Sequence, residues 1–198
     1  MDSYLVFDFE TSGLDPGRDR IIQVGVCIVR DGSVISTDGW LVNQSVRISA
    51  EARAVHGITE NDIQARGIPP QDSLARLFAL MGQAAGCVGH NIHRFDVLFM
   101  FSEARRLGLQ PPGVEDFVDT AALFKGWKLG CRKGPKETNR AYAERVLSMK
   151  AFGLKYSIPA CLKELRIDSK LVKAHDAAGD AYMTHLIYER LKSLTAGR

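Results

Sequence analysis

The stretch Tyr-Leu-Val-Phe-Asp-Phe-Glu-Thr-Ser-Gly, residues 4–13, decides how the chain begins to fold. Its aromatic and aliphatic residues predict a buried strand. Side chains two positions apart on a strand point to the same face, so Asp8 and Glu10 share one face while Phe7 and Phe9 occupy the other. Two acids on an apolar strand repel each other and lose hydration unless cations compensate them. The alternative is a pair of exposed carboxylates at a sheet edge.

The segments that follow predict an antiparallel meander and then helices alternating with short strands. Residues 20–30 form a second apolar run, and Asp31-Gly32 is a hairpin turn that leads to a third strand at residues 33–42. A short apolar run at residues 87–90 predicts one further strand. Helices are predicted from near Ser49 and at residues 70–83, 95–107, 119–125, 138–149, 157–165 and 177–194, and a loop at residues 126–135. The fold class is therefore α/β, with a mixed sheet flanked by helices.

Length and composition favour one domain over residues 1–198, because 45% of the residues are hydrophobic. A charged leader followed by an apolar segment is absent, and so is an apolar run long enough to span a membrane. We therefore expect a cytoplasmic protein with no membrane partner. The four cysteines are widely spaced, which disfavours zinc ribbons and paired redox motifs.

The net charge of +3 is unevenly distributed. Residues 125–155 hold nine basic and two acidic residues, a local charge of +7. Such a segment could bind a polyanion, since phosphate contacts supply most of the non-specific affinity for nucleic acids. The alternative is a solvated helical face with a loop.

Three further residues gain meaning only in combination. Asp96 begins a predicted helix, where a carboxylate could simply interact with the helix dipole. Asp180 lies near the start of the last predicted helix, and His175 precedes that helix. A single histidine in a loop is more often incidental than catalytic.

Together with Asp8 and Glu10, these residues resemble the DEDDh family of 3′-to-5′ exonucleases, which have an RNase H-like fold. The resemblance spans nearly the whole chain. Its motifs are Asp-x-Glu-Thr-x-Gly at residues 8–13, Val-His-Gly-Ile-Thr at 55–59, His-Asn at 90–91 leading to Phe-Asp at 95–96, Asp-Thr at 119–120, and His-x4-Asp at 175–180.

The resemblance implies a catalytic centre with two divalent cations, Mg²⁺ or Mn²⁺, which favour oxygen ligands. It implies that Asp8 bridges the two ions, that Glu10 and Asp180 complete the first ion site, and that Asp96 supports the second. His175 would be the general base that takes a proton from water, since histidine titrates near neutral pH. The implied activity releases nucleoside 5′-monophosphates from a free 3′ end.

The resemblance also implies substrate contacts just after the first acid and at the His-Asn pair of residues 90–91. We further expect a phosphate contact from the arginine that precedes Asp96 by two positions, and a grip on the substrate backbone by three basic residues of the glycine-rich loop. The expected substrate-binding residues are Phe9, Thr11, Leu14, His90, Asn91, Arg94, Lys128, Arg132 and Lys133.

The sequence leaves the substrate and partners open. Single-stranded DNA is favoured and RNA is the alternative, because the cation chemistry can serve either backbone. A 3′-to-5′ exoribonuclease in RNA trimming is therefore one rival interpretation. A polymerase-associated nucleic-acid-binding module with a vestigial centre is another, and the intact set of five residues argues against it. A homodimer is a further possibility.

Overall fold

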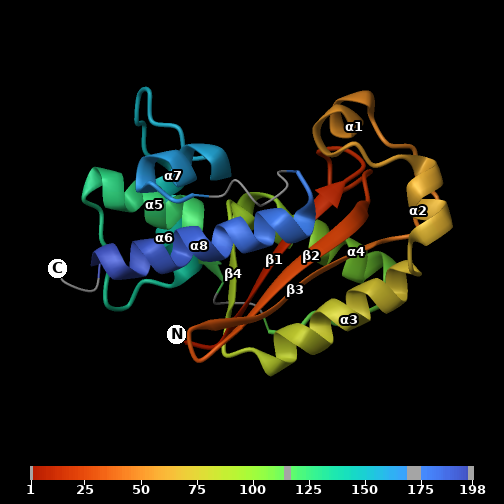
Figure 1. Cartoon of the computed structure of the whole chain (residues 1–198), viewed down its shortest axis with the longest axis horizontal. Coiled ribbons are helices and arrows are strands. Elements are labelled where there is room, and N and C mark those ends of the chain that lie inside the picture. Colours follow the sequence, from red (N-terminus) through yellow and green to blue (C-terminus); the bar gives the residue numbers. More distant parts are fainter. Residues whose placement is uncertain (1, 114–116, 169–174, 196–198) are drawn as a thin grey trace.

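The computed structural model describes residues 2–113, 117–168 and 175–195, and a five-stranded sheet lies at its centre (Figure 1). The strand order is β3-β2-β1-β4-β5. The first three strands, β1 Tyr4–Thr11, β2 Ile21–Arg30 and β3 Ser33–Leu41, form an antiparallel meander. The short strands β4 Cys87–Gly89 and β5 Val118–Asp119 run parallel to β1. The predicted mixed sheet is therefore confirmed.

The helices fill the connections of this sheet. They are α1 Ala50–His56, α2 Glu60–Arg66, α3 Pro70–Gln83, the 3₁₀ helix η1 Ile92–Arg94, α4 Asp96–Leu107, α5 Thr120–Leu129, α6 Asn139–Ser148, α7 Ile158–Leu165 and α8 Ala177–Thr195. Within the described ranges, none of them combines the length and the apolar composition needed to cross a membrane.

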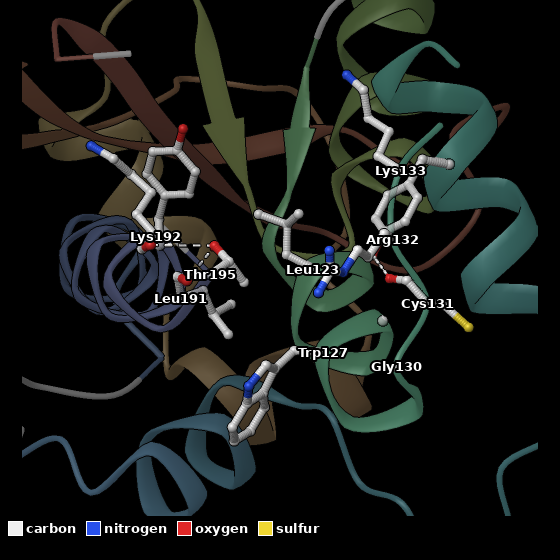
Figure 2. A pocket seen from close by; sticks show the side chains of 12 residues that line it. Leu123, Trp127, Gly130, Cys131, Arg132, Lys133, Leu191, Lys192 and Thr195 are labelled. Carbon is white, nitrogen blue, oxygen red and sulfur yellow. Dashed lines mark hydrogen bonds between the residues drawn. The ribbon is translucent and has the colours of Figure 1, made fainter. Parts of the chain in front are cut away.

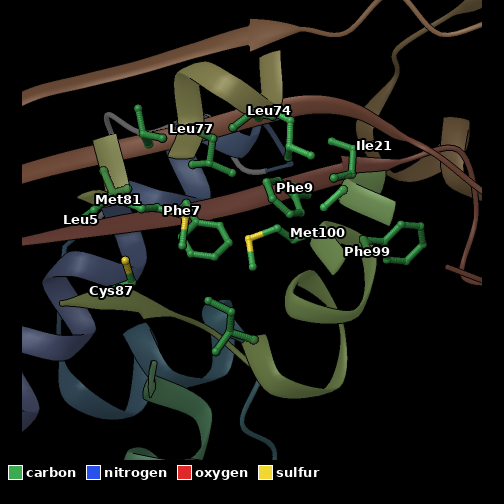
Figure 3. Packing of buried hydrophobic residues seen from close by; sticks show 14 of the residues in the cluster. Leu5, Phe7, Phe9, Ile21, Leu74, Leu77, Met81, Cys87, Phe99 and Met100 are labelled. Atoms are coloured by element: carbon green, nitrogen blue, oxygen red, sulfur yellow. The ribbon is translucent and has the colours of Figure 1, made fainter. Parts of the chain in front are cut away.

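One face of the sheet packs against α3 and α4. Residues Leu5, Phe7 and Phe9 of β1 enter a large apolar cluster with Leu77 of α3 and Phe99 of α4 (Figure 3). These β1 residues are two positions apart, as the alternation of a strand requires. Burying such large apolar side chains stabilises the fold by about 1.5–3 kcal/mol each.

The opposite face of the sheet packs against α8, which crosses it in Figure 1. Tyr4 and Val6 of β1 form a cluster there with Ala181 and Tyr188 of α8. Helices α5 and α7 extend this layer through contacts with α8. The even-numbered residues of β1 therefore face α8, and this places Asp8 on the α8 side.

Three local predictions differ from the structure, and the first concerns β5, whose Asp119 was expected to begin a helix. Helix α2 was not expected, because seven residues are too few for a clear helical period; Thr59 and Asp62 nevertheless close its start in a capping box. Gly126 was expected to begin a loop, yet it lies inside α5. A Cβ at that position would lie 1.9 Å from the Tyr142 hydroxyl, so the glycine permits close packing of α5 on α6.

Candidate active site

The carboxylates of Asp8, Glu10 and Asp180 form a compact acidic cluster. Asp8 and Glu10 project from the end of β1, and Asp180 projects from the first turn of α8. One oxygen from each residue lies within 4.8 Å of the others. All three side chains are half-buried in a pocket of about 600 Å³. Such a set of oxygen ligands fits a hard divalent cation.

The pKa values of the cluster show that burial and mutual repulsion disfavour the ionised carboxylates. Burial, with added repulsion from Asp96, Asp180 and Glu10, raises the pKa of Asp8 well above its usual range. Burial, followed by repulsion from Asp180, raises the pKa of Glu10 to about 8. Burial also raises the pKa of Asp180. A cation would favour the ionised forms and remove these penalties.

Asp96 joins this pocket from the first turn of α4. Its side chain is buried, and its Oδ1 accepts a hydrogen bond from the Phe9 backbone N–H at 3.0 Å. Burial raises the pKa of Asp96 to about 7, against the opposing effect of that hydrogen bond. Asp96 therefore ties the start of α4 to the strand that carries Asp8 and Glu10.

His175 lies just before α8 and lines the same pocket. It is exposed, and its backbone is left-handed with a φ of 59°, which is uncommon for a residue other than glycine. Its backbone N–H donates a hydrogen bond to the Asp180 carboxylate. The histidine is thereby held next to the acidic cluster with its side chain open to solvent.

Strand β2 fixes the start of α8 through a side chain and a glycine. The Gln23 side chain donates from Nε2 to Asp176 Oδ1 at 2.8 Å and accepts at Oε1 from the Ala177 N–H at 3.2 Å. Gly25, which pairs with Asp8 in the sheet, leaves room for the helix: a Cβ there would lie 1.9 Å from the Ala177 carbonyl carbon. A glycine inside a strand often marks such a close approach of another backbone.

The residues expected after the first acid lie beside the cluster. Phe9 lines the acidic pocket and a second hollow of about 680 Å³, which Thr11 and Leu14 also line. The Thr11 hydroxyl donates to the Gly13 carbonyl at 2.7 Å and is buried. Leu14 is 83% exposed at the rim of this hollow.

His90 and Asn91 also line the acidic pocket, and the His90 ring and the Asn91 backbone N–H are engaged within the protein. His90 Nε2 lies 2.7 Å from the Tyr156 carbonyl oxygen, so this nitrogen carries the hydrogen. His90 Nδ1 lies 2.8 Å from the Thr120 hydroxyl, and burial lowers the pKa of the ring. Asn91 has a left-handed backbone, and its N–H donates to Asp119 Oδ1 at 3.0 Å.

Four of the basic residues expected to bind substrate do not line the acidic pocket. Arg94 is exposed on η1. Lys128 forms an ion pair with Glu164. Arg132 and Lys133 line a separate pocket of about 440 Å³, with Leu191 of α8 at its other side (Figure 2). Among the described residues, none lines both this pocket and the acidic one.

One wall of the acidic pocket was not expected from the sequence. The segment 154–159, which leads into α7, forms this wall. No charge pattern marks it, and its position depends on the His90 hydrogen bond to Tyr156. Gln23 and Gly25 were missed as well, although a glycine inside the strongly apolar β2 was a usable signal.

Comparisons with known proteins bear on the family of this chain. A family model described as "Exonuclease" matches residues 5–188. A PolC-type DNA polymerase III of Caldanaerobacter subterraneus is 32% identical over 123 residues, covering 62% of this chain and 8% of that polymerase. The 3′-5′ exonuclease DinG of Bacillus subtilis is 29% identical over 134 residues, covering 64% of this chain and 14% of DinG. The chain thus corresponds to a small part of each.

The fold is also found in a solved structure. Exonuclease I of E. coli, in complex with a dA16 oligonucleotide, superposes on the whole chain with a TM-score of 0.78 and 19% identity, and the match covers 42% of exonuclease I. The zinc-bound form of that enzyme with single-stranded DNA gives a TM-score of 0.77. Because the family model covers nearly the whole length, the chain belongs to the exonuclease family, as its motifs indicated.

Proposed function

We propose that this chain is a 3′-to-5′ exonuclease that binds two divalent cations, Mg²⁺ or Mn²⁺, and removes nucleoside 5′-monophosphates from single-stranded DNA. The observation that carries the proposal is the cluster of Asp8, Glu10 and Asp180, held next to Asp96 and His175 in one pocket. Relatives named as a 3′-5′ exonuclease and a PolC-type DNA polymerase, and a structural neighbour bound to dA16, support the reaction and the substrate.

In this proposal, different acids would bind each of the two cations. Asp8, which experiences repulsion from each of the other three acids, would contact both ions, with Glu10 and Asp180 on one and Asp96 on the other. When bound, the cations would stabilise the attacking and leaving oxygens of the displacement. Because Oδ1 of Asp96 accepts the hydrogen bond from the Phe9 N–H, its Oδ2 would be the oxygen that contacts a cation.

His175 would supply the base. Its exposed side chain can accept the proton of the attacking water, and Asp180 stabilises the resulting imidazolium. The water oxygen then bonds to phosphorus, the bond from phosphorus to the 3′ oxygen of the preceding nucleotide breaks, and that oxygen regains a proton. Asn91 and the hollow lined by Thr11 and Leu14 would orient the terminal nucleotide.

The three basic residues retain a more distant role in this proposal. Lys128, Arg132 and Lys133 would contact the backbone of a strand long enough to extend beyond the acidic pocket. Neutralising all three should then flatten the salt dependence of binding for a long oligonucleotide and leave that of a dinucleotide unchanged. If the salt dependence of binding the long oligonucleotide stays unchanged, the three residues belong to a solvated surface with no role in binding.

The decisive experiment offers 5′-labelled single-stranded DNA, duplex DNA and RNA of one sequence to the protein with Mg²⁺ or Mn²⁺. We expect a ladder of products shortened from the 3′ end in the single-stranded DNA lane, and none with Asp8→Asn or with chelator. Cleavage of RNA alone would make the protein an exoribonuclease. Retained cleavage by Asp8→Asn would overturn the assignment of the centre.

The similarity to PolC-type polymerases makes a polymerase the partner to test. Co-purification with a replicative polymerase would support such a complex, and sedimentation of the purified protein would measure whether it forms a homodimer.

A further inference from the structure

The segment between α6 and α7, residues 149–157, stands out from the body of the molecule in Figure 1, and we call it the finger. Phe152 lies at its turn and is 98% exposed, the largest exposed fraction among the large hydrophobic side chains of the described residues. Gly153 follows with a left-handed φ of 74° and reverses the chain. A fully exposed phenyl ring gains nothing from the hydrophobic effect in the isolated protein.

Both ends of the finger are fixed. At its start, the buried Lys125 donates from Nζ to the carbonyl oxygens of Leu147 at 3.1 Å and Met149 at 2.6 Å. At its end, His90 donates from Nε2 to the Tyr156 carbonyl at 2.7 Å. The Lys125 ammonium also lies 5.4 Å from the centre of the Tyr156 ring, which joins the two ends. The finger is therefore a positioned feature and its base is ordered.

The outgoing half of the finger is part of the acidic pocket. Residues Leu154 to Ser157 line the same cavity as Asp8 and Asp96. Phe152 precedes Leu154 by two residues, so its Cα lies within about 7 Å of this wall, and its exposed ring is close to the outer rim of the pocket. A strand anchored by its 3′ end would meet the ring if it left the pocket on this side.

The charge of the finger suits a polyanion. Lys150 and Lys155 flank Phe152 and are both exposed, and no acidic residue occurs between Glu144 and Glu164. An exposed aromatic ring between two cations combines the two elements of a single-strand binding surface, because bases stack on the ring and phosphates contact the amines.

We propose that Phe152 stacks on an unpaired base of the substrate upstream of the cleaved bond, with Lys150 and Lys155 on the neighbouring phosphates. The proposal rests on the proposed nuclease function and names its preferred substrate. In a duplex the bases are paired and stacked on their neighbours, so a ring at the rim selects a single strand. The finger thus makes affinity depend on strand length beyond the terminal nucleotide.

The test compares Phe152→Ala with the wild type on two single-stranded substrates, a dinucleotide and a 12-nucleotide strand, with Mg²⁺. We expect kcat/KM for the longer strand to fall by about 5- to 150-fold, the range of one base-aromatic stack, while the dinucleotide is cleaved as before. Phe152→Trp should restore the longer substrate. Ile35→Ala, at an exposed residue on β3, is the matched control and should change neither.

Placing one abasic nucleotide at successive positions of the 12-nucleotide strand locates the contact. In the wild type one position should lower kcat/KM, and in Phe152→Ala that position should lose its effect. Equal kcat/KM for the two proteins on the longer strand, or an equal loss on both substrates, would overturn the inference and leave the nuclease function standing. If the wild type cleaves no oligonucleotide, the proposed function and the inference fall together.

Discussion

Replacing Gly25 by alanine should separate the two halves of the acidic cluster. The new Cβ would lie 1.9 Å from the Ala177 carbonyl carbon and 2.2 Å from the Ala178 nitrogen, both of them backbone atoms. Ordinary contact begins at 3.4 Å, so the first turn of α8 must move by about 1.5 Å, because close-packed interiors leave no free space. Asp180 belongs to that turn and moves with it, while Asp8 remains on the sheet.

Two effects of different size should follow. Overpacking typically costs about 1–3 kcal/mol, which in a chain of this length lowers Tm by about 2–12 °C. Misplacing a reacting group by 1 Å can cost about 100-fold in rate, so kcat/KM should fall by at least about that factor. The rise in Tm that we expect Mg²⁺ to cause in the wild type should also shrink, since Asp8 and Asp180 would no longer converge on one ion.

The assays are steady-state cleavage of a single-stranded oligonucleotide and thermal unfolding across a Mg²⁺ titration. Gly39→Ala is the matched control: it faces the same helix, but its new Cβ would meet the Ala178 Cβ at 3.1 Å, so a small adjustment suffices. We expect kcat/KM of Gly39→Ala to fall by less than about tenfold. A Gly25→Ala protein with wild-type kcat/KM and a wild-type Mg²⁺ response would refute the reasoning.

Three further predictions concern the centre and its supports. Asp8→Asn should raise the Tm of the cation-free protein, because it removes a buried, mutually repelling carboxylate, and should abolish both cleavage and the Mg²⁺-induced rise in Tm; a cation-free Tm below that of the wild type would contradict this. His90→Ala should lower the free energy of unfolding by about 1–3 kcal/mol, because the Tyr156 carbonyl loses its donor, and urea titration measures the change. Hydrogen bonds from Thr59 lower the pKa of Asp62 to about 2 from 3.8, so its contribution is present above pH 3.8 and lost as the pH falls through about 2; Asp62→Ala should make stability less dependent on pH in that window, and an unchanged acid unfolding profile would contradict this.

The meander of the sheet could be predicted because its signals are local. The apolar run of β2 and the Asp31-Gly32 turn define a meander without reference to the rest of the chain. The shared face of Asp8 and Glu10 follows from the period of a strand in the same way. Helix α2 escaped prediction because its seven residues show too little periodicity.

The convergence of the site could not be derived from local signals. Asp180 reaches Asp8 across 172 positions only because α8 packs on the glycine of β2, and spacing in the sequence contains no such information. Only the family resemblance placed Asp96, His175 and Asp180 with the first two acids. For the loop basic residues the resemblance offered no guide, and charge alone does not indicate that Arg132 and Lys133 line a different pocket.

The alternation along β1 ties the acidic cluster to the correct pairing of the sheet. Phe7 and Phe9 fill the core on one side, while Asp8 and Glu10 meet Asp180 on the other. If β1 paired one residue out of register, its carboxylates would face the apolar core and its phenyl rings would face the pocket. The register of β1 must therefore be correct for either face to form. A molecule with the slipped register would therefore lack the acidic cluster, and we expect it not to cleave nucleic acid.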